Sequence, residues 1–332
     1  MSRYARQSAV PSFGPEGSRA LSKSRVLVIG AGGLAAPVLQ YLVGAGVGMI
    51  RLVDQDRVSL SNLHRQTLFS EADVGQPKVT VAARRMAALN GDVTVAPLCE
   101  RFGPGTVAAL CEGVDLVLDC ADSFAASYAA SDFCHANGIP LISASVVGME
   151  GYCGGFCGGS PSLRALFPDL PERLGSCDAD GVLGPAVGVI GSLQAQMAMA
   201  VLARQTPSPL GQLVSYDATQ MRFGQFRFDQ AAEPDAGHRF IASEAMTASD
   251  HIIDLRAKDE PGPAIQHHLR STVDDLKATG LPKDITGQRI VLACRSGLRA
   301  WQAADALTTQ GHTDIALVAL GDGDPQNLET NS

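Results

Sequence analysis

The turn at residues 30–35, Gly-Ala-Gly-Gly-Leu-Ala, constrains the fold of this chain more than any other feature. It follows a continuous apolar run, Arg25–Ile29, and precedes a segment, Leu34–Val43, whose apolar residues recur with helical spacing. Small residues between a buried strand and a helix let the backbone approach a phosphate group at the helix N-terminus. We therefore expect Gly30, Gly32 and Gly33 to line a nucleotide site.

Strand and helix patterns continue to alternate along the first two thirds of the chain. Further strands are expected at Met49–Val53, Val93–Ala96, Asp115–Asp119 and Pro140–Ser143, and helices at Lys78–Leu89 and Phe124–Asn137. This alternation predicts an α/β fold with a Rossmann-like, mainly parallel sheet and helices on both faces.

A second, smaller α/β domain is expected after a polar, turn-rich linker. The chain has 332 residues, which suits two domains. In the second part, strand patterns at His251–Asp254, Arg289–Ala293 and Ile315–Val318 accompany a helical pattern at Ala300–Gln310. The predicted organisation is a first domain at 1–228, a linker at 229–240, a second domain at 241–326 and a tail at 327–332.

Charge and composition exclude several classes of partner. The formal net charge is −8 and no Lys/Arg run exceeds two residues, so we expect neither nucleic acid nor an anionic membrane as a partner. The N-terminus has no apolar signal core, which predicts a cytoplasmic protein with reduced thiols. The uncharged stretch 181–203 is about long enough to span a bilayer, but its Gly-Pro pair and glutamines favour a buried core helix.

Acidic and basic residues after the second expected strand indicate which nucleotide binds. Asp54 stands where an acid accepts hydrogen bonds from a ribose, which fits an NAD-linked dehydrogenase equally well. A dehydrogenase has no need for Arg65 and Lys78, whereas these cations can neutralise a triphosphate and a departing pyrophosphate. Asp122, at the end of a strand, is placed to hold Mg²⁺. Together these residues favour adenylyl transfer from ATP.

Over residues 3–228 the sequence resembles the MoeB/ThiF/HesA family, the prokaryotic relatives of ubiquitin-activating enzymes. The resemblance rests on motifs in a consistent order: Arg3-Tyr-x-Arg6-Gln7, Gly-x-Gly-Gly33, Asp54-x-Asp56, Ser61-Asn-Leu-x-Arg65-Gln66, Gly-x-Pro-Lys78, Leu118-Asp-x-x-Asp122, Gly181-Val-Leu-Gly-Pro185 and Gly188-Val-Ile-Gly-Ser-Leu-Gln194. It implies a homodimer that uses ATP and Mg²⁺ to adenylate the C-terminal glycine of a ubiquitin-like sulfur-carrier protein.

The same resemblance implies roles for individual residues. The nucleotide and its phosphates would be bound by Gly30, Gly32, Gly33, Asp54, Asp56, Asn62, Arg65, Gln66, Lys78, Asp122 and Ser123. Asp122 would hold the metal, and Arg6 would reach into the partner subunit's site. Two alternatives stay open, because Asp56 can instead orient its loop and Gln66 can instead hold the loop by hydrogen bonds. Ser123 stands where the family usually has Asn.

The cysteines do not supply the metal site that the family usually has, and most of them are expected to be buried thiols. Relatives in this family hold a structural zinc with two C-x-x-C pairs, and the first pair would fall here at Ser162 and Ala165. Neither a hydroxyl nor a methyl group replaces a thiolate ligand, so we expect no zinc. Small buried side chains are expected for Cys99, Cys111, Cys120, Cys134, Cys153 and Cys157.

Cys177 differs because it lies in a polar loop before the apolar helix. It matches a family cysteine that, in some members, links covalently to the carrier or relays sulfur. As a thiolate it can attack an acyl-adenylate or accept a persulfide, although the flanking Asp178 and Asp180 disfavour the anion. The alternative is an exposed loop thiol.

The C-terminal part contains a second reactive thiol in the loop Cys294, Arg295, Ser296, Gly297, Leu298 and Arg299. It follows a strand and opens a helix, so converging backbone N–H groups can stabilise a thiolate or persulfide. A phosphatase also places a cysteine and an arginine in one loop, although its Cys-x5-Arg spacing is one residue longer than that from Cys294 to Arg299. The loop resembles the active loop of rhodanese-like sulfurtransferases, over about residues 240–322, although the family's Gly-His-Ile landmark is missing. A degenerate docking domain remains the alternative.

These features combine into one predicted reaction. The carrier tail is adenylated, and a persulfide on Cys294, supplied by a persulfide or thiosulfate donor, yields a thiocarboxylate. The alternatives are an NAD-dependent oxidoreductase, a carrier-docking scaffold with a degenerate sulfurtransferase domain, and adenylation of a peptide. The pathway, whether molybdopterin, thiamine, cysteine or tRNA thiolation, stays open.

Overall fold

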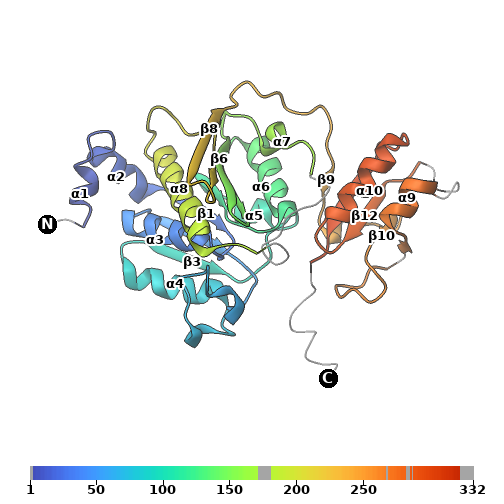
Figure 1. The fold of residues 1–332 in the computed structure, drawn as a ribbon, viewed down its shortest axis with the longest axis horizontal. Coiled ribbons are helices and arrows are strands. Elements are labelled where there is room, and N and C mark those ends of the chain that lie inside the picture. The colour runs from blue at the N-terminus through green and yellow to red at the C-terminus, as the bar shows by residue number, and fades with distance from the viewer. Residues whose placement is uncertain (1–2, 171–180, 267, 282–284, 286, 322–332) are drawn as a thin grey trace. The chain divides into compact units, whose positions relative to one another are not determined.

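A computed structural model describes residues 3–170, 181–266, 268–281, 285 and 287–321 (Figure 1). The chain forms two compact units. The first comprises Met1–Phe102, Thr106–Leu166 and Gly175–Glu233, and the second comprises Gly103–Gly105, Phe167–Leu174 and Pro234–Ser332. The last residue of the first unit, Glu233, lies within the linker expected at residues 229–240.

The first unit is built on an eight-stranded sheet in the order β3-β2-β1-β4-β5-β6-β7-β8. Its strands are β1 (Arg25–Ile29), β2 (Met49–Val53), β3 (Thr94–Leu98), β4 (Leu116–Asp119), β5 (Pro140–Val147), β6 (Glu150–Cys157), β7 (Gln212–Asp217) and β8 (Arg222–Arg227). The strands from β3 to β5 pair in parallel, which confirms the mainly parallel α/β sheet expected from the sequence. The order reverses at β1, whose carboxyl end therefore faces the crevice where such sheets bind ligands.

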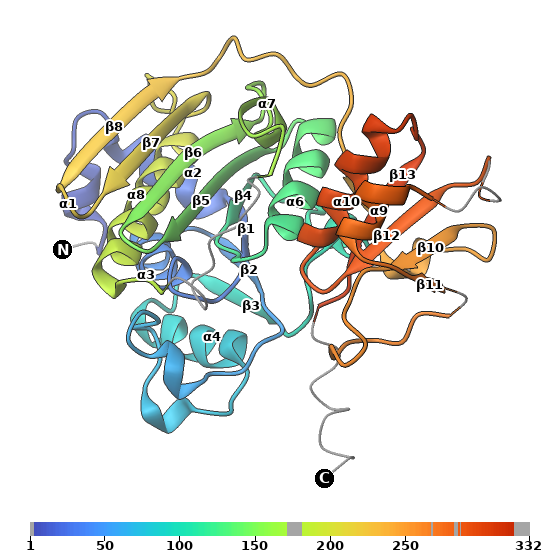
Figure 2. The same cartoon turned by 45° about the vertical axis from the view of Figure 1, so that its right-hand side comes forward.

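Helices cover both faces of this sheet (Figures 1 and 2). They are α1 (Ala5–Ser8), α2 (Gly14–Lys23), α3 (Ala35–Ala45), α4 (Lys78–Leu89), α5 (Val107–Leu110), α6 (Phe124–Asn137), α7 (Leu163–Leu166) and α8 (Gly184–Leu202). On one face, α3, α4 and α8 bury alternate strand residues such as Val28, Leu52 and Leu118 in a single core. Helices on the other face bury the remaining residues of β1 and β4, and burial on both faces explains why these strands read as continuous apolar runs.

Strands β6, β7 and β8 extend the sheet with antiparallel pairs that begin at Pro140↔Cys157. The sequence did not indicate them, because β6 contains three glycines and every residue of β8 is exposed, so neither strand alternates polar and apolar residues. The reversal of strand order lies in the parallel half of the sheet, and the antiparallel half widens the core beneath α8.

Helix α8 is, among the described residues, the one helix long and apolar enough to cross a membrane. Its buried face carries Ile190, Gln194 and Ala198, and 56% of its most apolar window is buried within the protein. The Gln194 amide donates hydrogen bonds to the backbone oxygens of Asp119 and Ile142, at 2.7 and 3.1 Å. These contacts are those of a core helix that anchors β4 and β5.

The second unit is a small α/β fold with a five-stranded parallel sheet in the order β11-β10-β12-β13-β9. Its elements are β9 (Arg239–Phe240), β10 (His251–Asp254), β11 (His268–Arg270), α9 (Val273–Thr279), β12 (Ile290–Cys294), α10 (Leu298–Thr309) and β13 (Ile315–Ala319). Ile252, Val291 and Val318 lie in its core, and Trp301 of α10 is also buried.

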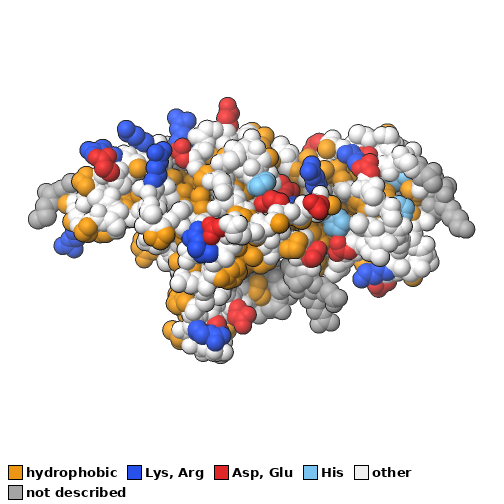
Figure 3. Space-filling view, turned by 90° about the horizontal axis from the view of Figure 1, so that it is seen from above, with side chains coloured by type: hydrophobic (Ala, Val, Ile, Leu, Met, Phe, Trp, Pro, Cys, Tyr) orange, Lys and Arg blue, Asp and Glu red, His pale blue; other side chains and the backbone are white. Residues whose placement is uncertain are grey.

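Charged side chains of both signs are interspersed on the face shown in Figure 3. The chain has 26 Lys and Arg against 34 Asp and Glu residues. The expectation that nucleic acid is not a partner stays a prediction.

Candidate active site

The glycine turn lies at the carboxyl end of β1, between β2 and β4 in the sheet. Gly30 has a φ of +88°, and a Cβ at this position would lie 2.8 Å from the backbone oxygen of Cys120. Only glycine allows both this backbone conformation and this close approach. The turn is therefore fixed against β4 and delivers the chain into α3, whose N-terminus points at the crevice.

Gly33 packs beneath a side chain from the 61–66 turn. A Cβ on Gly33 would lie 2.8 Å from Cγ1 of Val187 in α8 and 3.6 Å from Cγ of Arg65. A Cβ on Gly184, at the start of α8, would lie 2.5 Å from the backbone oxygen of His64. The glycine turn, the Arg65 segment and the N-terminus of α8 are thus in direct contact, so Arg65 lies beside Gly33.

The Asp54 carboxylate connects the glycine turn to the segment after β2. Its Oδ2 accepts a hydrogen bond from the Ala31 N–H at 2.7 Å, and its Oδ1 accepts one from the Asp56 N–H at 2.7 Å. Burial raises the pKa of Asp54, and the ammonium of Lys78 opposes this rise. The expected ribose-binding acid is therefore held at the crevice by two backbone donors.

Asp56 holds Lys78 at the start of α4. The Lys78 Nζ lies 2.8 Å from Oδ2 of Asp56, and the Lys78 N–H donates to the Asp56 backbone oxygen at 2.9 Å. The Lys78 side chain is 6% exposed, whereas that of Asp56 is 57% exposed. This contact favours the positioning role for Asp56, and it links Lys78 through Asp56 and Asp54 to the glycine turn.

The turn from Ser61 to Gln66 carries the remaining expected phosphate ligands. Asn62 ends a short 3-10 helix, and its backbone oxygen accepts hydrogen bonds from the N–H groups of Arg65 and Gln66, at 3.1 and 2.9 Å. Gln66 is buried, and among the described residues its Oε1 has no hydrogen-bond partner. Its amide nitrogen lies 3.7 Å from the Cβ position of Gly32. The unsatisfied atom is an acceptor, so a ligand group that donates a hydrogen bond would satisfy it.

Asp122 and Ser123 follow β4 at the same edge of the sheet, because Asp119 pairs with Ile29 at the end of β1. Asp122 is exposed, and Ser123 precedes the first residue of α6. An exposed carboxylate at this edge is free to bind a cation, and carboxylate oxygen is the donor that Mg²⁺ prefers.

Sequence reasoning missed the role of Asp119, the last residue of β4. It is fully buried and accepts hydrogen bonds from the Ser143 hydroxyl at 2.7 Å and from the Ala121 N–H at 3.2 Å. Burial raises the pKa of Asp119. Because its backbone oxygen also binds Gln194, Asp119 fixes the strand end from which the Asp122 loop departs. The signal that could have identified Asp119 is an acidic residue at the end of an apolar strand.

Arg6 lies in α1, before the glycine turn in the sequence, and its side chain is exposed. The structure contains a single chain, so the expected contact of Arg6 with a partner subunit stays a prediction. Cys177, the expected relay thiol, lies outside the described residues.

The cysteine predictions hold with one correction. Five of the six thiols expected in the core are buried: Cys111, Cys120, Cys134, Cys153 and Cys157. Burial raises the pKa of Cys157 to about 12, which keeps its thiol protonated. Cys99 is exposed, and the expectation that it is buried was wrong. It follows β3, the edge strand of the sheet, where one side of the chain has no neighbouring strand.

The position expected for zinc in relatives holds a polar contact of a different kind. The Ser162 N–H and hydroxyl both donate to the Glu233 carboxylate at 2.6 Å. Next to it, Arg164 Nε and Nη2 donate to the Asp132 carboxylate at 2.5 and 2.9 Å. One carboxylate and one hydroxyl do not make the four-ligand thiolate set of structural zinc. The residues present therefore do not fit this metal.

In the second unit, Cys294 is the buried last residue of β12 and its loop leads into α10. Its Sγ accepts a hydrogen bond from the Gly297 N–H at 3.1 Å. Arg295 and Ser296 are exposed at the tip of the loop, and Leu298 begins the helix. The loop thus has a backbone donor aimed at the sulfur, as expected for a site that stabilises a sulfur anion.

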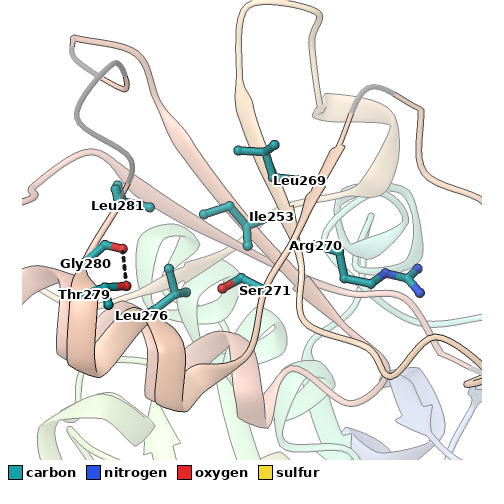
Figure 4. Close-up of a pocket in the computed structure, with 8 residues that line it drawn as sticks. All are labelled: Ile253, Leu269, Arg270, Ser271, Leu276, Thr279, Gly280 and Leu281. Carbon is teal, nitrogen blue, oxygen red and sulfur yellow. Dashed lines mark hydrogen bonds between the residues drawn. The ribbon is translucent and has the colours of Figure 1, made fainter.

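A cavity of about 350 Å³ lies elsewhere in the second unit, beside β10, β11 and α9 (Figure 4). Its lining is mainly apolar and includes Ile253, Leu269 and Leu276. The Arg270 guanidinium, at its edge, donates to Asp254 at 2.9 Å. None of the lining residues belongs to the Cys294 loop.

Comparison with known proteins places the first unit in a family. Residues 4–237 match the model of the ThiF family. The chain is 40% identical to the SAMP-activating enzyme E1 of Haloferax volcanii over 225 residues, which cover 67% of this chain and 83% of that protein. It is 41% identical to the molybdopterin-synthase adenylyltransferase of Escherichia coli over 229 residues, which cover 68% of this chain and 92% of that protein.

A longer relative and a solved structure complete the comparison. The adenylyltransferase and sulfurtransferase MOCS3 of Bos taurus is 42% identical over 228 residues, which are 68% of this chain but 50% of that protein. A crystal structure of E. coli MccB with ATP matches with a TM-score of 0.61 and 22% identity, and the match covers 71% of this chain and 73% of that one. At this identity the match shows the shared fold.

Proposed function

Because this chain belongs to the ThiF family, we propose that it is an adenylyltransferase that uses ATP to activate the C-terminal carboxylate of a ubiquitin-like sulfur-carrier protein. Matched relatives named for this chemistry support the proposal, among them a molybdopterin-synthase adenylyltransferase and a SAMP-activating enzyme. The observation that carries it is the contact set around the glycine turn, where Arg65 packs on Gly33 and Asp54 and Asp56 connect Lys78 to Ala31.

In the proposed reaction, a carboxylate oxygen of the carrier tail attacks the α-phosphorus of ATP. A new O–P bond forms, the bond to the bridging oxygen breaks, and pyrophosphate leaves with the electron pair. Arg65 and Lys78 would stabilise the negative charge that develops on the leaving group, and Asp54 would orient the ribose. Mg²⁺ held by Asp122 would supply further positive charge at the phosphates.

The test is carrier-dependent exchange of labelled pyrophosphate into ATP. We expect exchange with the wild-type chain and a loss of about 10²–10³-fold in Lys78→Ala, because a preorganised charge at the leaving group is removed. Arg222→Ala serves as the matched control, since Arg222 is an exposed cation on the edge strand β8 and should leave exchange unchanged. Hydride transfer to NAD in place of exchange would support the oxidoreductase alternative.

We further propose that the second unit is a rhodanese-like domain that supplies sulfur. The persulfide on Cys294 would attack the acyl-adenylate, release AMP and form an acyl disulfide. A second thiol, for which Cys177 is the candidate, would then cleave the disulfide, leaving a thiocarboxylate on the carrier and a disulfide on the enzyme. The Gly297 N–H aimed at the Cys294 sulfur supports this proposal, as does the printed name of MOCS3.

Cys294→Ala separates the two halves of the proposed reaction. We expect the variant to retain pyrophosphate exchange, because Cys294 belongs to the second unit, and to lose thiocarboxylate formation from thiosulfate or a persulfide donor. Carrier thiocarboxylate is measured by intact-mass spectrometry, with Cys99→Ala as the control for an exposed cysteine. Unchanged sulfur transfer in Cys294→Ala would support a docking role for the second unit.

A further inference from the structure

We infer that Glu260 is a positioning residue for the Cys294 loop, where its carboxylate holds the Arg299 guanidinium against the thiol. The inference rests on the proposed function for what the thiol carries, since sulfur transfer is the chemistry assigned to this loop. The geometry and its main test do not depend on that assignment.

The sulfur of Cys294 accepts a backbone hydrogen bond at the start of a helix. Cys294 is fully buried, its Sγ accepts from the Gly297 N–H at 3.1 Å, and the twelve-residue helix α10 begins directly afterwards. Gly297 has a φ of +93°, and a Cβ there would lie 2.6 Å from Cε1 of Phe240. The loop conformation therefore requires glycine, and this conformation aims the N–H at the sulfur.

Arg299 brings the positive charge of the loop to this sulfur. It is the second residue of α10, and its guanidinium donates to Oε1 of Glu260 at 2.5 Å. Glu260 raises the pKa of Arg299, burial opposes the rise, and the nearby sulfur of Cys294 adds to it. The carboxylate therefore holds the guanidinium at the first turn of α10, the helix that the Cys294 loop opens.

Glu260 is itself held in place from the neighbouring strand. Its Oε2 accepts a hydrogen bond from the Ala257 N–H at 3.1 Å, and its own N–H donates to the Ala257 oxygen at 3.1 Å. This turn follows Asp254 at the end of β10, which is fully buried and paired with Arg256. Glu260 therefore extends from a rigid part of the fold toward Arg299.

Removal of Glu260 has two opposite effects on the Cys294 thiolate, one through net charge and one through the position of Arg299. The Glu260 carboxylate cancels part of the positive charge beside the sulfur, so its removal would favour the thiolate if charge alone mattered. Arg299 is 35% exposed at its side chain, however, and without Glu260 its long chain is free to extend into water. If position matters more, removal of Glu260 disfavours the thiolate.

The experiment titrates the Cys294 thiolate in the full-length chain by its ultraviolet absorbance. Each variant is measured against the same variant carrying Cys294→Ala, so that the difference reports this thiol alone. We expect Glu260→Ala to move the titration midpoint of the Cys294 thiol upward by about one pH unit. The released Arg299 guanidinium would no longer place its positive charge beside the sulfur. Glu260→Gln, which keeps an oxygen that can accept from Arg299, should move it less. Asp250→Ala, which breaks the separate Arg289 ion pair of this unit, should not move it.

A double-variant comparison shows whether Glu260 acts through Arg299. Glu260→Ala and Glu260→Gln should have no effect in a chain that already carries Arg299→Ala. A downward shift, no shift, or an equal shift in the Arg299→Ala background would overturn the inference. Thermal unfolding of each variant checks that the fold is retained, and if Glu260→Ala does not fold, the Glu260→Gln pair decides.

Sulfur transfer from thiosulfate is measured in parallel and separates this inference from the proposed function. If wild type transfers no sulfur while the titrations follow the expected order, the sulfurtransferase proposal fails and the role of Glu260 stands. If wild type transfers sulfur and the titrations do not follow that order, the role of Glu260 fails alone.

Discussion

At the scale of single residues, Asp56 fixes the direction of the Lys78 ammonium. The Asp56–Lys78 contact of 2.8 Å joins a nearly buried amine to a carboxylate that is more than half exposed. We expect Asp56→Ala to lower pyrophosphate exchange by about tenfold, less than Lys78→Ala, because the amine remains but loses its orientation. Glu112→Ala, at an exposed acid of the same unit, is the control. Full exchange in Asp56→Ala would remove Asp56 from the site.

Most of the candidate nucleotide residues were predictable because each belongs to an ordered local motif. Gly33, Arg65 and Lys78 were identified from the sequence, and the structure brings Arg65 onto Gly33 and connects Lys78 to the glycine turn. Asp119 was missed, because its importance depends on Ser143 and Gln194, which are distant in the sequence. Exposure of Cys99 was missed for a similar reason, since it depends on the place of β3 at the sheet edge.

At the scale of elements, the Ser162–Glu233 contact ties the end of the first unit to the segment that begins α7. Both hydrogen bonds to Glu233 are 2.6 Å long. We expect Glu233→Ala to lower the free energy of unfolding of the first unit by about 1–2 kcal/mol, the range for hydrogen bonds to a partly exposed charge. Chemical denaturation measures this, with Glu112→Ala as the control, and an unchanged midpoint would contradict it.

The Ser162–Glu233 contact also bears on metal binding. Because Ser162 donates hydrogen bonds to Glu233 where a zinc-binding thiolate was judged to be missing from the sequence, treatment with a strong chelator should leave the melting temperature unchanged. One equivalent of zinc in the purified protein, lost together with thermal stability on chelation, would show that the protein holds zinc at ligands outside this account.

Several elements of the parallel half were predictable to the residue, although β3 was expected at Val93–Ala96 and β5 at Pro140–Ser143, against Thr94–Leu98 and Pro140–Val147 in the structure. Arg25–Ile29, Met49–Val53 and Lys78–Leu89 have the bounds read from the sequence, because a strand buried on both faces and an amphipathic helix each leave a clear pattern. The antiparallel strands β6 and β8 left none. Their pairing is set by neighbouring strands in the sheet. Their own sequences, rich in glycine or in exposed residues, have no alternating pattern that would predict a strand.

At the scale of the whole molecule, the proposed homodimer would complete each site with Arg6 from the partner subunit. If so, Arg6→Ala and Lys78→Ala chains that are each inactive should recover exchange when unfolded, mixed and refolded together, because a mixed dimer contains one intact site. Each variant refolded alone is the control. Absence of recovery, with mixed dimers shown to form by native mass spectrometry, would rule out this contribution in trans.

The central proposal is that the site around Gly33, Arg65 and Lys78 couples a carrier carboxylate to AMP. The most direct measurement is the intact mass of a ubiquitin-like sulfur carrier after incubation with this chain and MgATP. The account expects a carrier species heavier by one AMP group, formed with release of pyrophosphate and absent with Lys78→Ala. A carrier that stays unmodified across the candidate carriers, while ATP is converted to ADP and phosphate, would contradict it.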